Sequence, residues 1–156
     1  MTRPILIAAA ALAFAAPALA APVPPETPAG PDFLVQNGKA KGVVTTASGL
    51  EYFIVKSGPK TGPHPSAEDT ASFDYEVKLL TGETIDSSYE RGEPLTGRVG
   101  AFVPGFTEAL ELMRPGDEWI VWVPPQLGYG DKDSGPIPAN SVLRFRLALH
   151  SVTPAG

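Results

Sequence analysis

The residues best suited to chemistry in this chain lie in one stretch, from Val103 to Gly130. Phe106 stands near the start of a short helical pattern, and Tyr129 stands between two glycines after an apolar strand pattern. A tyrosine between glycines in a loop is a poor core residue, and its hydroxyl can donate and accept hydrogen bonds. Phe106 and Tyr129 can therefore face one cavity, with an apolar floor and a polar group beside it.

Other kinds of catalytic site find little support in the sequence. The chain has two histidines and no cysteine, and it lacks the H-E-x-x-H pattern, which argues against a catalytic metal site. His64 lies in a proline-rich loop, and His150 lies on the outward face of a predicted strand. There is no G-x-S-x-G elbow and no phosphate-binding P-loop. We therefore expect neither a metal nor another cofactor.

The start of the chain has the pattern of an export signal. Arg3 precedes an apolar run from Ile5 to Ala16, and Ala18-Leu19-Ala20 fits the small-x-small rule for cleavage. We predict a signal peptide at residues 1–20, cleaved after Ala20 with Ala18 as the alternative, and a periplasmic or secreted protein. An uncleaved anchor is the competing interpretation, but the run is short for a membrane span. No stable membrane anchor is expected.

Composition bounds what the remaining chain can bind. The 156 residues carry a net charge of −5, and removal of residues 1–20 takes away one arginine and leaves about −6. No basic patch suggests nucleic acid as a partner. Without cysteines the protein cannot form disulfides, so its core alone must hold the fold.

The hydrophobic patterns predict one domain behind a proline-rich segment. Residues 21–47 are expected to form a tether and an amino-terminal segment, in which Phe33 and Leu34 mark a marginal helical turn. Residues 48–153 are expected to form the domain. Residues 70–80 and 142–150 alternate between apolar and polar side chains, as in an antiparallel sheet with one wet face. The helix predicted at residues 104–113 must cover the dry face, with Glu108 and Glu111 on its solvated side. The expected fold class is therefore α+β, a curved antiparallel sheet wrapped over one short α-helix.

Four motifs, in order, carry a resemblance to a known family. They are Phe73-Asp-Tyr-Glu-Val77, Gly82-Glu-Thr-Ile-Asp-Ser-Ser88, the unit from Val103-Pro-Gly-Phe106 to Leu127-Gly-Tyr-Gly130, and Gly135-Pro-Ile-Pro-Ala-Asn-Ser-Val-Leu-Arg-Phe145. The chain resembles the FKBP-type peptidyl-prolyl cis-trans isomerases from about Ser48 to Val152. The resemblance implies an enzyme that isomerises X-Pro bonds in proline-containing polypeptides. It also implies the macrolides tacrolimus and rapamycin as candidate inhibitors, and the short segment before the domain favours a monomer.

The resemblance also implies roles for particular residues. Asp86 matches the acid beside the substrate amide, and Tyr129 matches the hydroxyl that donates to a substrate carbonyl. Phe106 matches the pocket floor, where many members have tryptophan. Further pocket and rim positions are matched by Tyr75, Ile85, Arg91, Leu95, Phe102, Val103, Ile137 and Phe145.

The residues themselves leave alternatives open. On pattern alone Val103, Phe106 and Phe145 would be core residues, and Asp86 fits a cap of the following turn, with Arg91 as its ion-pair partner. A client-binding module with little or no turnover is the alternative to an enzyme. Ile120 and Trp122 would point away from the predicted core face. They form either a surface patch for a partner or a surface that the segment around Phe33 covers.

Overall fold

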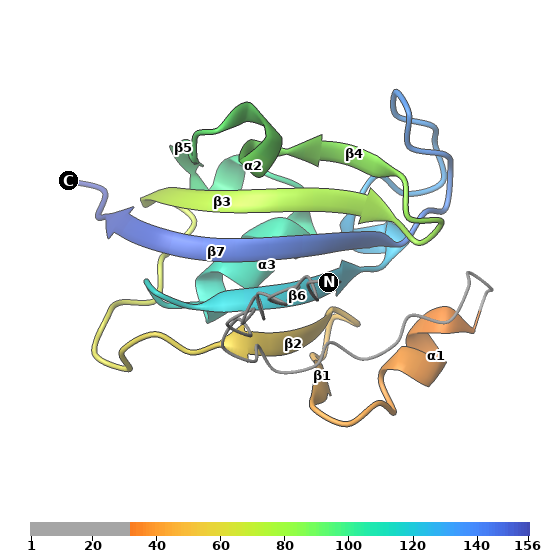
Figure 1. Cartoon of the computed structure of the whole chain (residues 1–156), viewed down its shortest axis with the longest axis horizontal. Coiled ribbons are helices and arrows are strands. Elements are labelled where there is room, and N and C mark those ends of the chain that lie inside the picture. Colours follow the sequence, from red (N-terminus) through yellow and green to blue (C-terminus); the bar gives the residue numbers. More distant parts are fainter. Residues whose placement is uncertain (1–31) are drawn as a thin grey trace, which may run out of the picture.

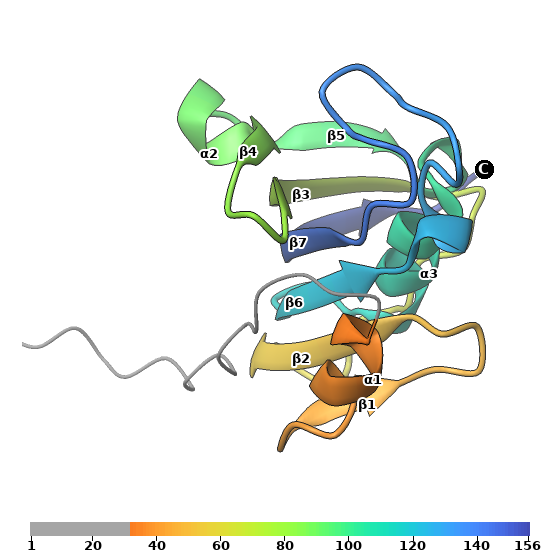
Figure 2. The same cartoon turned by 90° about the vertical axis from the view of Figure 1, so that its right-hand side faces the viewer.

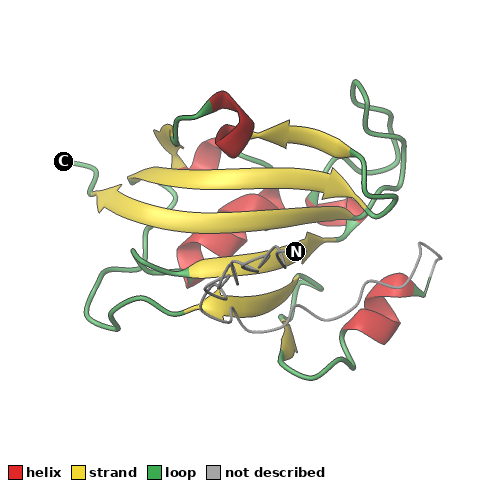
Figure 3. Ribbon diagram, in the orientation of Figure 1, coloured by secondary structure: helices red, strands yellow, loops and turns green. Residues whose placement is uncertain are grey.

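The computed structural model describes residues 32–156 of the chain, so the predicted signal peptide and residues 21–31 of the predicted tether lie outside the described residues. The helical elements are α1 (Phe33–Asn37), α2 (Ser88–Arg91), α3 (Pro104–Leu112) and the 3₁₀ turns η1 (Val99–Ala101) and η2 (Pro125–Leu127). The strands are β1 (Val43–Thr45), β2 (Glu51–Lys56), β3 (Thr70–Leu79), β4 (Thr84–Ser87), β5 (Leu95–Arg98), β6 (Glu118–Val123) and β7 (Leu143–Thr153). Figure 3 separates the two classes by colour.

Within residues 32–156 the strands form one seven-stranded sheet, and each pairing is antiparallel. The order is β1-β2-β6-β7-β3-β4, and β5 pairs with β3 next to β4. The two long strands β3 and β7 run side by side through the middle of the sheet, and α3 lies behind them (Figure 1). The predicted fold class, an antiparallel sheet over one short helix, is confirmed.

The helix α3 packs closely on one face of the sheet. Pro104 occupies its first turn, where a missing backbone N–H costs nothing. Phe106, Ala109 and Leu110 are buried against the sheet. Gly105 permits the close approach, because a Cβ atom there would lie 2.6 Å from a methyl carbon of Val123. This contact fixes the first turn of α3, and with it Phe106, against the end of β6.

The opposite face of the sheet carries a second, smaller apolar cluster. Ile120 and Trp122 on β6 point away from α3 and pack with Phe53 and with Phe33 of α1. Figure 2 shows α1 beside β1 and β2, at the far end of the sheet from β4 and α2. Of the two interpretations left open for Ile120 and Trp122, the cover by the segment around Phe33 is the correct one: both side chains are at most 2% exposed.

The structure differs from the sequence prediction at two other places. The short helix α2 has no counterpart among the predicted elements, because four residues are too few to show a helical period. Glu108, predicted on the solvated side of α3, is half-buried, and its carboxylate accepts hydrogen bonds from Thr46 (2.8 Å) and Ser48 (2.6 Å). It thus ties α3 to the turn between β1 and β2.

Candidate active site

A cavity of about 460 Å³ opens between α3, the sheet and the loops at one edge. It contains every site residue predicted from the sequence except Arg91. The lining residues are Tyr75, Val77, Ile85, Asp86, Leu95, Ala101, Phe102, Val103, Phe106, Tyr129, Ile137, Leu143 and Phe145. Val77, Ala101 and Leu143 were not predicted as site residues, since their sequence positions look like ordinary strand and turn positions.

The floor of this cavity is aromatic. Phe106 is 4% exposed and lies at the centre of a group of rings. Its ring centroid is 4.8 Å from that of Phe102, 5.1 Å from that of Phe145 and 5.3 Å from that of Phe73. The tilted and edge-to-face arrangements are the ones that aromatic quadrupoles favour. Phe106 is therefore both a core residue and a cavity residue, so the two interpretations of it are not exclusive.

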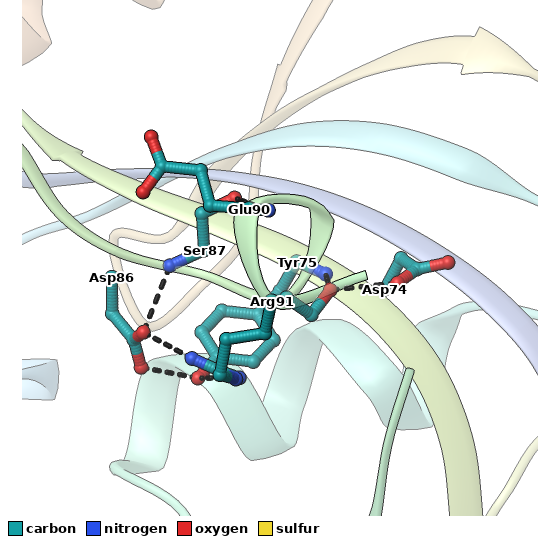
Figure 4. Close-up of polar contacts among 7 residues, drawn as sticks. Asp74, Tyr75, Asp86, Ser87, Glu90 and Arg91 are labelled. Carbon is teal, nitrogen blue, oxygen red and sulfur yellow. Dashed lines mark hydrogen bonds and ion pairs between the residues drawn. The ribbon is translucent and has the colours of Figure 1, made fainter. Parts of the chain in front are cut away.

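The polar side of the cavity is one compact hydrogen-bonded cluster, drawn in Figure 4. The Tyr75 hydroxyl on β3 donates to Oδ2 of Asp86 on β4. The Arg91 guanidinium at the end of α2 forms an ion pair with Oδ1 of Asp86, and its Nη2 donates to the Tyr75 hydroxyl at 3.0 Å. Oδ1 of Asp86 also accepts from the backbone N–H of Ser87 at 2.8 Å. The predicted pairing of Asp86 with Arg91 is thus present.

These contacts set the charge of the cluster. The hydrogen bond from Tyr75, helped by Ser87 and Arg91, lowers the pKa of Asp86 below its ordinary value. Burial, together with the neighbouring Asp86 carboxylate, raises the pKa of Tyr75. At neutral pH the cavity therefore presents an ionised carboxylate whose oxygens are already engaged by donors. Arg91, predicted at the rim, contacts Asp86 and Tyr75 but is not one of the residues that line the cavity.

Tyr129 occupies the other side of the cavity mouth. It follows η2 and is 45% exposed. The loop that carries it is held by backbone hydrogen bonds from Gly130 N–H to the Pro125 carbonyl and from Asn140 N–H to the Gly130 carbonyl, both 2.9 Å. The same loop folds Ile137 back over the cavity, where it is 6% exposed. A hydroxyl on a fixed loop, facing an apolar floor, is suited to bind a carbonyl oxygen that enters the cavity.

A second hollow, of about 490 Å³, lies beside α1. Its lining is mostly apolar and has no titratable side chain, so it offers nothing for acid–base chemistry. The lining residues are Phe33, Leu34, Leu79, Leu80, Thr81, Pro125, Pro138, Asn140, Ser141 and Val142.

Within residues 32–156, the histidine, aspartate and glutamate side chains form no group of three that would suit a metal ion. In the same part of the chain, no helix is long and apolar enough to cross a membrane.

Comparison with known proteins places this fold and site in a family. The family model for FKBP-type peptidyl-prolyl cis-trans isomerases matches residues 62–150. The FKBP-type isomerase FkpA of Aeromonas hydrophila is 40% identical over 123 residues, which is 79% of this chain and 45% of the relative. The outer membrane protein MIP of Legionella longbeachae is 41% identical over 127 residues, 81% of this chain and 54% of the relative.

A solved structure agrees with the sequence relatives. The crystal structure of FkpA from Escherichia coli superposes with a TM-score of 0.76 at 38% identity, covering 80% of this chain and 58% of that one. The chain thus spans about half the length of the curated relatives it matches. The region matched by the family model contains α3, the cavity and the polar cluster. Because this model and the relatives match most of the described residues, the chain belongs to the FKBP-type peptidyl-prolyl cis-trans isomerase family.

Proposed function

We propose that the protein catalyses cis–trans isomerisation of X-Pro bonds in polypeptides, and that the cavity over Phe106 is its active site. The observation that carries the proposal is the composition of this cavity. An aromatic floor is flanked by an ionised aspartate on one side and an exposed tyrosine hydroxyl on the other. The family of the chain supports the same activity.

This chemistry fits a site without a nucleophile or a metal. The barrier to rotation about an X-Pro bond is roughly 18–20 kcal/mol, because the amide loses its conjugation as it twists. An apolar cavity lowers this barrier, since water stabilises the planar, polarised amide more than the twisted one. A ten-thousand-fold acceleration needs about 5.4 kcal/mol of preferential binding of the twisted state. Desolvation and one or two well-placed hydrogen bonds can supply this.

Each part of the site has a role in this proposal. Phe106 and the rings around it hold the proline ring away from water. Tyr129 donates a hydrogen bond to a substrate carbonyl, and Asp86 lies beside the twisting amide. Arg91 and Tyr75 keep the Asp86 carboxylate in place through the ion pair and the hydrogen bond.

The test is a peptide isomerisation assay on the protein and on variants of the two polar groups. Tyr129→Phe removes one hydroxyl, and we expect kcat/KM to fall about two- to tenfold. Asp86→Leu should lower it at least as much. Tyr52→Phe is the matched control, because Tyr52 stacks on Trp119 outside the cavity with ring centroids 4.2 Å apart. It should leave kcat/KM unchanged.

Two outcomes would contradict the proposal. If the wild-type protein turns over peptides and neither Tyr129→Phe nor Asp86→Leu slows it, the site lies elsewhere. If calorimetry detects peptide binding while neither peptides nor a proline-limited refolding protein are accelerated, the domain is a client-binding module. Binding the planar and twisted amides equally well gives affinity without rate.

The cavity rim also bears on substrate choice. Ile85, Leu95 and Phe102 are partly buried apolar residues that pack against the core beside the cavity. We infer that a bulky apolar residue before proline is preferred there. An acidic residue at the same position should be a poor substrate, because Asp86 is ionised. A peptide series that varies only this residue measures the preference.

Three further properties belong to this proposal. Export to the periplasm, with residues 1–20 as a signal peptide and 48–153 as the domain, is supported by the sequence pattern and by a relative named as an outer membrane protein. A monomer is supported by the scattered positions of the exposed apolar side chains among the described residues. Tacrolimus and rapamycin are proposed ligands of the same cavity, to be tested by calorimetry with a Phe106→Ala control.

A further inference from the structure

Ser88 fastens the helix α2 to the sheet from inside the protein. It is the first residue of α2, and it is the one residue of that helix that is buried, with no exposed surface. Its hydroxyl oxygen accepts a hydrogen bond from the backbone N–H of Tyr75 at 2.9 Å and donates one to Oδ1 of Asp74 at 2.7 Å. Both partners are on β3, so a single side chain joins α2 to the strand that carries Tyr75.

Asp74 is held in turn by the neighbouring strand. Its second oxygen, Oδ2, lies 2.7 Å from Nε2 of His150 on β7. Partial burial opposes ionisation of Asp74, but the hydrogen bonds from Ser88 and His150 outweigh it and lower the pKa of the carboxyl group. Asp74 precedes Tyr75 on β3, so its side chain points to the face of the sheet opposite the cavity. It therefore contacts neither the cavity nor a substrate within it.

The helix that is fastened in this way carries an essential part of the polar cluster. Arg91 is the last residue of α2, and its guanidinium holds both the Asp86 carboxylate and the Tyr75 hydroxyl. Another contact of α2 with the sheet is on the surface, where the ring of Tyr89 lies 5.3 Å from the guanidinium carbon of Arg146. With only four residues, α2 has little packing of its own. The place of Arg91 therefore depends on Ser88 and on the carboxylate that orients it.

We propose that Asp74 and Ser88 are positioning residues of the isomerase site. They hold α2 so that Arg91 keeps Asp86 and Tyr75 in the arrangement that faces the substrate. This inference rests on the proposed function and deepens it, because neither residue touches the cavity. It predicts that a side chain on the outer face of the sheet controls the reaction rate through Arg91.

The main variant is Asp74→Ala, which leaves the Ser88 hydroxyl without its acceptor. We expect kcat/KM to fall about three- to tenfold, mostly in kcat, because the substrate-binding floor is untouched. Asp74→Asn keeps an acceptor for Ser88 and should restore kcat/KM to within about twofold of wild type. His150 is exposed, so His150→Ala should fold and cost about twofold, since one carboxylate oxygen is released.

Asp69→Ala is the matched control for a general loss of stability. Asp69 immediately precedes β3, and its carboxylate also accepts two hydrogen bonds, from the backbone N–H groups of Ser66 (2.8 Å) and Ala155 (3.0 Å). It makes no contact with α2 among these bonds. We expect Asp69→Ala to lower the melting temperature but to leave kcat/KM within about twofold of wild type.

A double-mutant comparison separates positioning from plain structure. If Asp74 acts through Arg91, then Asp74→Ala should cost less than about twofold in a protein that already carries Arg91→Ala. An equal loss in both backgrounds, or a wild-type rate for folded Asp74→Ala and His150→Ala, would overturn the proposal.

If the wild-type protein itself has no turnover, the proposed function is wrong, and NMR then tests whether Asp74 positions α2 and Arg91. Faster exchange of the Tyr75 amide and of the Arg91 guanidinium protons in Asp74→Ala would support it, and unchanged exchange would overturn it.

Discussion

At the scale of single residues, Asp86 is the group on which the site's electrostatics depend. Its carboxylate receives a hydrogen bond from Tyr75, one from the Ser87 backbone and an ion pair from Arg91. The hydrogen bond from Tyr75 is the largest of the effects that lower its pKa. A carboxylate with its donors in place needs no rearrangement when a substrate arrives, which is the property that catalysis by preorganised charge requires.

Tyr75→Phe should raise the pKa of Asp86 in the folded protein towards its ordinary value. The lowered pKa in the wild type contributes stability at pH values above the ordinary aspartate pKa, and this contribution is lost as the pH falls through the folded-state pKa. The variant should therefore lose less stability on acidification. The ring that packs near Phe106 is retained, with 6.2 Å between the centroids in the wild type. An NMR titration of the Asp86 carboxyl carbon measures the shift, and an unchanged pKa would assign the effect to Arg91 instead.

At the scale of elements, α1 is short and yet has a clear structural role. It covers the face of the sheet that α3 does not reach, and Phe33 packs there with Ile120 and Trp122. A five-residue helix is far below the length at which helices are stable alone, so its order comes from this contact. Glu51 of β2 adds a polar attachment, because its buried carboxylate accepts a hydrogen bond from Asn37 at 2.7 Å.

Phe33→Ala should lower the free energy of unfolding by about 3 kcal/mol, since it removes a buried aromatic ring and leaves Trp122 less covered. Urea denaturation gives the free energy, and tryptophan fluorescence should shift to longer wavelength in the folded variant. Val35 on the same helix is 58% exposed, so Val35→Ala should change stability by less than about 0.5 kcal/mol. Equal effects of the two substitutions would show that α1 does not cover the sheet in solution.

Glu51→Gln should stabilise the protein at neutral pH. Burial raises the pKa of Glu51, although the hydrogen bond from Asn37 opposes this. Because this pKa is raised in the folded state, ionisation of Glu51 destabilises the folded protein at pH values above it. The destabilisation disappears as the pH falls through the raised pKa towards the ordinary glutamate value. Glutamine keeps an acceptor for Asn37 without the charge, so we expect a gain of about 1 kcal/mol, or roughly 3–5 °C in Tm. The gain should vanish in acid, and a gain that is independent of pH would contradict this account.

At the scale of the whole molecule, the periodic elements were predictable and the short ones were not. The alternation in β3 and β7 and the helical spacing of α3 are long enough to read, and the family motifs then placed Phe106, Asp86 and Tyr129 together. Four-residue α2 has no readable period, so the helix that brings Arg91 to its predicted partner Asp86 could not be predicted from the sequence. The cover of Trp122 by Phe33 also stayed open, because it depends on how two distant segments meet in space.

Light scattering on the purified chain should give the mass of one molecule, 16.3 kDa before any cleavage, at all concentrations. The large apolar side chains exposed in residues 32–156 come from several elements and are Val35, Val44, Ile54, Tyr89, Leu112 and Tyr129. The second apolar face of the sheet is already covered by α1. A concentration-independent dimer mass would contradict this prediction. Val35→Asp and Ile54→Asp would then locate the interface.

The central place of β7 in the sheet has a consequence for how the molecule is made. Ribosomes build the chain from its amino end, so β7 emerges after the other six strands of this sheet in residues 32–156, yet it lies between β6 and β3. Until it arrives, β1-β2-β6 and β3-β4-β5 are two separate half-sheets that share no strand pairing. Pairings between strands so far apart in sequence form slowly. A nascent chain stalled before residue 143 should therefore stay sensitive to protease, and the cavity should form only after β7 has left the ribosome.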